Sequence, residues 1–181
     1  MPPSWRRRPT DAGLAVKVLG IDPGTAQIGY GLVVSEKGAF RLWECGVLRI
    51  RGRPPLPERL REIHLGITEL IARHTPDVVA VEDIFFGRNV RTTVTLGHAR
   101  GVILLAAVSA GLTIAEYPPA IVKKTVVGRG GAQKNQVAYM VEKLLRLRNP
   151  PEPADAADGV ALALTHLLLQ ADPRRRLAAT P

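Results

Sequence analysis

The sequence predicts an α/β fold in which helices cover a mixed five-stranded sheet, with the elements in the order βββαβαβαα along the chain. Two patterns lead to this prediction. Three short apolar runs of strand length come first, and similar runs then alternate with longer segments of helical periodicity. Consecutive strands pair through tight turns, whereas strands separated by helices become parallel neighbours through right-handed crossovers.

The first three elements are predicted to be strands. Val16 to Asp22 is a short run rich in β-branched residues, and it ends at the turn signal Pro23-Gly24. Ile28 to Val34 is a second such run, so the two strands are expected to be joined by a tight turn. A third strand is expected over about residues 40–50, before a proline-rich loop.

Helices and strands alternate through the middle of the chain. Apolar residues recur with helical spacing over residues 60–71, which predicts an amphipathic helix. The wholly apolar residues 78–81 are typical of a central strand that is buried on both faces. A second helix is expected over about residues 90–110, ended by Gly111, and a short strand follows over residues 112–116.

The last part of the sequence is predicted to be helical. A helical turn is expected after Pro118-Pro119, and helical patterns return over residues 134–147 and 155–170. A length of 181 residues with 46% apolar content suits one folded core. We therefore expect a basic N-terminal extension without fixed structure (residues 1–16), one domain (17–170) and a basic C-terminal tail (171–181).

Four carboxylates stand at the ends of these elements. Asp22 and Glu82 each end a predicted strand, and the carboxyl ends of adjacent parallel strands form the usual binding edge of such a sheet. Asp155 and Asp158 are three residues apart and therefore project from one face of a helix. Carboxylates gathered beside a buried strand are unfavourable unless cations bind them, so the pattern predicts a magnesium site.

Each acid also has a structural interpretation. Asp22 could be a turn former before Pro23-Gly24. Asp155 and Asp158 could serve only to cap the helix and interact with its dipole. Glu82 is harder to explain in this way, because charged residues beside a buried strand are rarely neutral to stability.

Basic residues are concentrated near these acids in a chain of net charge +9. Over residues 121–148 the only acid is Glu142, and a second basic stretch that includes Arg100 directly follows Glu82. They could be solvated helix faces, but their position beside the carboxylates favours contacts with a polyanion. The basic residues predicted to contact the phosphates of a nucleic acid are Arg88, Arg91, Lys123, Lys124, Arg129 and Lys134.

Composition restricts the cellular setting. Cys45 is the only cysteine, so the chain cannot form an internal disulfide, and a cytoplasmic protein is expected. The longest uncharged run, residues 101–115, is shorter than the roughly 20 residues that span a bilayer. We expect no membrane partner.

Separated motifs over residues 17–170 resemble the RuvC family of bacterial Holliday-junction resolvases, within the RNase H-like superfamily. The segments that carry the resemblance are VLGIDPGTAQIGYGLV, VAVEDIFF, GHARGV, VKKTVVGRGGAQKNQV and DAADGVALALTH, in that order. The resemblance implies an RNase H-like fold and a homodimeric endonuclease that cuts four-way junction DNA symmetrically during recombination and repair. Branch-migration helicase proteins are implied as further partners.

The resemblance also assigns roles to residues. By motif position, the family's four metal-binding acids match Asp22, Glu82, Asp155 and Asp158, although some members carry His where this chain has Asp155. Two Mg²⁺ ions roughly 4 Å apart, or two Mn²⁺ ions in their place, could generate the nucleophile and stabilise the leaving oxygen. Lys134 matches a family lysine near the active site and is expected to stabilise the transition state.

Two residues have competing interpretations. Phe85 matches a family aromatic that contacts unstacked bases near the junction centre, whereas packing in the core is the alternative. Lys123 could assist catalysis or only attract phosphate.

Two other functions are compatible with parts of the sequence. GIDPGT also resembles the first phosphate loop of actin-like ATPases and sugar kinases, but those need two such lobes and this chain has one. An inactive junction-binding protein is the second, and the intact set of acids argues against it.

Overall fold

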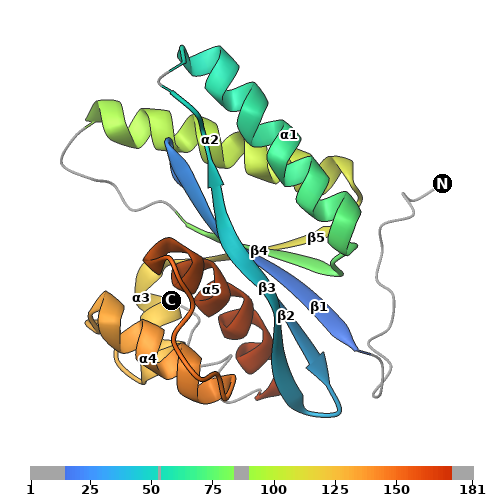
Figure 1. Cartoon of the computed structure of the whole chain (residues 1–181), viewed down its shortest axis with the longest axis vertical. Helices are drawn as coiled ribbons and strands as arrows, with labels where there is room; N and C mark the ends of the chain where they lie inside the picture. Colours follow the sequence, from blue (N-terminus) through green and yellow to red (C-terminus); the bar gives the residue numbers. More distant parts are fainter. Residues whose placement is uncertain (1–14, 53, 84–89, 173–181) are drawn as a thin grey trace.

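The structure is a computed structural model that describes residues 15–52, 54–83 and 90–172. Five strands form one sheet between two layers of helices (Figure 1). The strands are β1 (Val16–Asp22), β2 (Gln27–Glu36), β3 (Ala39–Arg49), β4 (Val78–Glu82) and β5 (Thr113–Tyr117). The helices are α1 (Leu56–His74), α2 (Val90–Ser109), α3 (Pro119–Val127), α4 (Lys134–Leu144) and α5 (Ala154–Ala171).

The sheet has the order β3-β2-β1-β4-β5, with β1 at its centre. β1, β2 and β3 pair antiparallel through short turns, and β4 and β5 add parallel to the other side of β1. The predicted mixed five-stranded sheet is therefore confirmed. β1 and β4 are neighbouring parallel strands, so their carboxyl ends lie at the same edge of the sheet.

Each face of the sheet packs against its own helices. α1 and α2 cover one face, and α3, α4 and α5 cover the other (Figure 1). Alternation along β1 explains the two cores: Leu19 and Ile21 point towards α1 and α2, whereas Val18 points towards α5. This double coverage accounts for the wholly apolar residues 78–81 of β4.

Helix α5 lies very close to the strands beneath it, and glycine makes this approach possible. A Cβ atom at Gly20 of β1 would lie 2.5 Å from the backbone nitrogen of Ala163 in α5. One at Gly31 of β2 would lie 2.6 Å from the Cα of Val160, and one at Gly159 of α5 would lie 2.6 Å from the backbone of Tyr30. Glycines on both sides of this contact, which we call the glycine seam, bring backbone against backbone.

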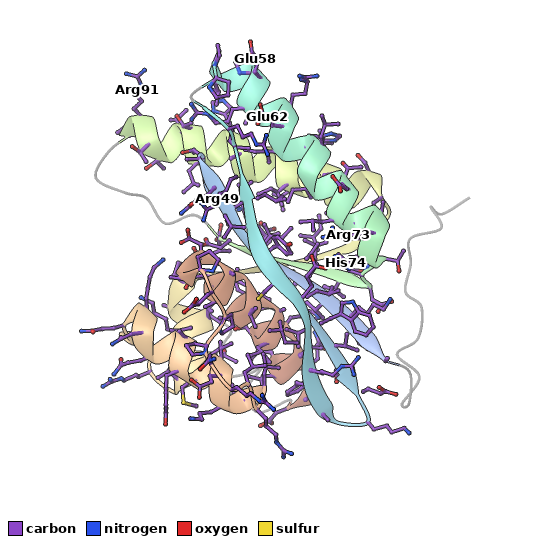
Figure 2. All side chains as sticks on the ribbon, viewed as in Figure 1. Arg49, Glu58, Glu62, Arg73, His74 and Arg91 are labelled. Atoms are coloured by element: carbon purple, nitrogen blue, oxygen red, sulfur yellow. The ribbon has the colours of Figure 1, made fainter. Side chains whose placement is uncertain are left out.

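The edge strand β3 is tied to the end of α1 by a polar cluster. The Tyr30 hydroxyl donates to Glu44 Oε1 at 2.9 Å, and Arg73 pairs with the same oxygen at 2.6 Å. His74 Nε2 lies 3.3 Å from the other oxygen of Glu44. Figure 2 shows Arg73 and His74 side by side at the end of α1. These contacts fix β3, which has a sheet neighbour on one side only.

The element order differs from the prediction by one helix. A single helical turn was expected after Pro118-Pro119, but α3 continues for nine residues. Pro119 begins the helix, and Gly128 ends it with a φ of 92°, in the left-handed region. Helix α3 is too short to show a clear apolar period in sequence.

Helix α2 is apolar on two faces, and one of them is buried in the protein. Ala99, Ile103, Ala106 and Ala107 are buried in the core shared with α1. Among the described helices, α2 alone is long and apolar enough to cross a membrane by length and composition, with 22% of that stretch buried. Length and composition do not tell a spanning helix from one that packs against protein, so the expected absence of a membrane partner stays a prediction.

Candidate active site

Asp22 and Glu82 lie side by side at the edge of the sheet. The register of β1 and β4 pairs Ile21 with Val81, and Asp22 and Glu82 are the next residues along the two parallel strands. Both carboxylates are half-buried, because the helices on either face cover the strand ends. The two predicted strand-end acids therefore converge.

Helix α5 brings the other two acids to the same place. One ligand oxygen from each of Asp22, Asp155 and Asp158 lies within 4.8 Å of the others. Gly29 allows this approach: it pairs with Asp22 across the sheet, and a Cβ atom there would lie 2.5 Å from the carbonyl carbon of Asp155. Glu82 is not part of this group of three but shares a hydrogen bond with Asp22.

Burial and like charge perturb this site strongly. Burial, together with the negative charges of Glu82 and Asp158, raises the pKa of Asp22 to about 8. Burial also raises the pKa of Glu82, while the hydrogen bond with Asp22 acts in the opposite direction. The protonated Asp22 carboxyl thus donates to Glu82, and without a cation the pair holds a proton near neutral pH.

Two lysines contribute positive charge to the acids. The Lys134 ammonium group donates to Asp158 Oδ2 at 2.7 Å, and this hydrogen bond raises the pKa of Lys134. Lys134 begins α4, so its position depends on the turn between α3 and α4. Lys123 of α3 is near enough for its charge to lower the pKa of Glu82. Both lysines lie where the sequence placed them, beside the acids.

The other residues predicted to contact DNA are distributed differently. Lys124 is exposed on α3, and Arg129 is exposed in the turn before α4. Figure 2 shows Arg91 pointing away from the protein near the start of α2. Phe85 and Arg88 lie outside the described residues, so their predicted roles stay predictions.

Arg100 differs from the other basic residues near Glu82. Its guanidinium group pairs with Asp83 at 3.2 Å and with Glu116, at the ends of β4 and β5. Its side chain is 18% exposed. Arg100 therefore joins α2 to the strand ends, a role that the run of basic residues in the sequence did not indicate.

Gln27 is a site residue that sequence reasoning missed. It begins β2, and its side-chain amide donates to Asp155 Oδ2. The local sequence gave no signal for this contact, because the partners are far apart in the chain and meet only through the packing of α5 on β2.

The donor set suits a divalent metal ion. Carboxylate oxygens are the ligands that Mg²⁺ and Mn²⁺ prefer, and three of them converge here beside a fourth acid. The raised pKa of Asp22 is a second indication of a cation site. It shows that the protein alone does not stabilise all of the negative charge gathered there. The structure thus places Asp22, Asp155 and Asp158 where they could bind a metal ion together, with Glu82 beside them.

Comparisons with known proteins identify the family. The family model described as crossover junction endodeoxyribonuclease RuvC matches residues 18–166. The RuvC protein of Syntrophomonas wolfei is 47% identical over 152 residues, covering 84% of this chain and 88% of that protein. The RuvC protein of Chloroflexus aggregans is 47% identical over 151 residues, covering 83% and 92%.

Solved structures give the same result. Thermus thermophilus RuvC aligns with a TM-score of 0.79 at 37% identity, covering 91% of this chain and 98% of that one. Thermus thermophilus RuvC in complex with a Holliday junction substrate aligns with a TM-score of 0.77 at 35% identity, covering 86% and 95%. The yeast mitochondrial Holliday junction resolvase Ydc2, at 14% identity and a TM-score of 0.63, shares the fold. This chain belongs to the RuvC family of crossover junction endodeoxyribonucleases.

Proposed function

We propose that this protein resolves four-way DNA junctions by metal-dependent hydrolysis of two opposed phosphodiester bonds. The observation that carries the proposal is the convergence of Asp22, Asp155 and Asp158 within 4.8 Å, next to Glu82, in a chain of this family. These four acids would hold two divalent ions. Mg²⁺ is the ion we propose, and Mn²⁺ is expected to substitute for it.

The chain's own groups prepare the site for a phosphate. When bound, the metal ions would supply a hydroxide nucleophile and neutralise charge on the leaving 3′ oxygen. Asp22 would release its proton as the site is loaded, because a ligating carboxylate must be ionised. Lys134 would then turn from Asp158 towards the scissile phosphate, since its long side chain is largely exposed, and stabilise the charge added in the transition state.

Positive charge around the acids would hold the DNA. Lys123, Lys124 and Arg129 lie on α3 or in the turn that follows it, and Lys134 begins the next helix. A phosphate backbone that crosses this turn would meet the lysines on its way to the metal site. Arg91, Arg88 and Phe85 are further predicted contacts, with Phe85 against unstacked bases.

We propose a homodimer formed through the exposed face of α2. Val90, Val94, Leu105 and Val108 are 53–74% exposed, and together with Gly97 and Gly101 they form one stripe opposite the buried face of the helix. Apolar residues around two glycines allow a second copy of α2 to approach closely. A two-fold pair would also place two metal sites symmetrically, as cleavage of two opposed strands requires.

Light scattering checks the dimer. The full chain should have twice the mass of the 19.6 kDa monomer at micromolar concentration, and Leu105→Lys should reduce it to the monomer mass, because a charge would be buried in the interface. Leu65→Lys is the matched control, since Leu65 is equally exposed (56%) on α1. A monomeric wild-type protein would contradict this interface.

A cleavage assay tests the proposed function. The purified chain should cut a synthetic mobile four-way junction by paired nicks in Mg²⁺ or Mn²⁺, and should leave it intact in EDTA. Linear duplex of the same sequence is the control and should remain uncut, because its strands do not present the opposed sites of a junction. Comparable cutting of duplex would contradict a junction resolvase.

Two further predictions rest on the family resemblance and on the cysteine content. Branch-migration helicase proteins are expected partners, and a cytoplasmic location is expected. No contact of the described residues tests either of them, so both stay predictions.

A further inference from the structure

Gln27 holds the carboxylate of Asp155 from the neighbouring strand. The Gln27 side-chain amide, at the first position of β2, donates a hydrogen bond to Asp155 Oδ2 in the first turn of α5. Gln27 is paired with Arg49 of β3, so its backbone is part of the sheet. The donor is therefore mounted on a strand and not on a loop.

The same strand also fixes the backbone of Asp155. Gly29 is two residues after Gln27 and so lies on the same face of β2, towards α5. A Cβ atom at Gly29 would lie 2.5 Å from the carbonyl carbon of Asp155, so the two backbones are in direct contact. Gly29 thus sets where Asp155 sits, and Gln27 sets where its carboxylate points.

Asp155 does not cap its helix. Pro153 is the N-cap residue of α5, and no side chain makes a capping hydrogen bond there. The Asp155 carboxylate instead accepts from Gln27 and places an oxygen within 4.8 Å of Asp22 and Asp158. The capping role considered from the sequence is therefore absent at this helix end.

The two acids of α5 have partners of different chemistry. Asp158 is paired with the ammonium group of Lys134. This ammonium group neutralises the carboxylate and must move away before a metal ion can bind there. Asp155 is paired with a neutral amide, which orients a carboxylate without cancelling its charge. A carboxylate has room for about four acceptor contacts, so one amide leaves lone pairs for a metal ion.

We infer that Gln27 is a positioning residue, whose amide fixes the orientation of the Asp155 carboxylate for a divalent metal ion. The inference rests on the proposed function for the presence of the metal. Metal affinity would then depend on one residue outside the four acids. Gln27 would influence it only through Asp155.

Calorimetric titration of the full metal-free chain with Mn²⁺ tests this role without DNA. Gln27→Met has a side chain of similar length without a donor, and should weaken Mn²⁺ binding by about tenfold, the lower end for loss of a group that orients a metal ligand. Gln170→Met, at the exposed far end of α5, is the matched control and should bind Mn²⁺ as the wild type does.

A double-mutant cycle separates positioning from a general structural effect. If Gln27 acts through Asp155, Gln27→Met should cause no further loss of Mn²⁺ affinity in an Asp155→Asn chain. An equal loss in both backgrounds would overturn the inference, and so would unchanged affinity in the single variant or no Mn²⁺ binding by the wild type. Wild-type protein that binds Mn²⁺ but cuts no junction would instead contradict the proposed function.

Discussion

Replacing Asp22 with Asn should slow junction cleavage by about a thousandfold or more, while junction binding is retained. The substitution keeps the shape of the side chain but removes the charge of an acid at the centre of the group. Metal ions supply several kcal/mol of charge stabilisation in such reactions, and each ~1.4 kcal/mol corresponds to a tenfold change in rate. The DNA contacts lie on other elements and should be unaffected.

Single-turnover cleavage with excess protein and saturating Mg²⁺ measures this effect, and a gel-shift assay in EDTA measures binding. Glu36→Gln is the matched control, because Glu36 is an exposed acid at the far end of β2. Its cleavage rate should equal that of the wild type. A rate for Asp22→Asn within tenfold of the wild type would exclude Asp22 from the metal site.

The same substitution should have the opposite effect on the stability of the metal-free protein. Because the folded-state pKa of Asp22 is raised from 3.8 to about 8, the folded protein binds more protons than the unfolded chain between these values. The free energy of unfolding should therefore fall as the pH rises from about 4 to about 8. Asp22→Asn should flatten this dependence and be more stable than the wild type at pH 8, by about 1–3 kcal/mol.

Urea denaturation in EDTA at pH 5 and pH 8 would show this difference as a shift in midpoint. Glu36→Gln again serves as the control and should follow the wild-type pH dependence. A wild-type protein whose stability is the same at both pH values would show that Asp22 is not buried beside like charges as the structure has it.

The second large effect is expected from Gly20→Ala, which should destabilise the fold by about 3 kcal/mol, the upper range for overpacking. The added Cβ would lie 2.5 Å from the Ala163 backbone nitrogen and closer still to the carbonyl oxygen of Gly159. Backbone atoms cannot move aside as the end of a flexible side chain can. Helix α5 would have to shift away from β1, and it carries twelve of the buried residues.

Urea denaturation monitored by circular dichroism measures this loss. Gly131→Ala is the matched control: the position has open space within 4 Å and a backbone outside the left-handed region. Its stability should remain within about 0.5 kcal/mol of the wild type. Equal midpoints for Gly20→Ala and the wild type would mean that α5 is not seated on β1 at this distance.

The fold class was predictable because both of its signals are local. Strand-length apolar runs and helical periods can be read within a short window, and their order determines a mixed sheet. The third helix was predicted only as a single turn, because α3 is nine residues long and its limits are set by Pro119 and Gly128. The family could be recognised because its motifs surround these same elements.

The site was predictable in part. Asp22 and Glu82 stand at strand ends, where an acid is conspicuous, and the structure places them side by side. The contact of Gln27 was not predictable, because β2 was expected to begin at Ile28, which left Gln27 in the turn. In the structure β2 begins one residue earlier, and Gln27 joins the face that meets α5. The sequence placed Arg100 in a basic stretch. Its acidic partners come from the ends of two strands, so the ion pairs could not be predicted from neighbouring residues.

The glycine seam has a consequence for the energetics of catalysis. Because α5 rests on β1 and β2 through backbone atoms, the distance between the backbone of Asp22 and the backbones of the α5 acids is fixed by direct contact and not by intervening side chains. Docking of the helix during folding therefore brings the backbones of these acids together before metal or DNA binds. The backbone of the site is therefore preorganised, and the changes left for metal and substrate binding are the loss of a proton from Asp22 and the movement of the Lys134 side chain.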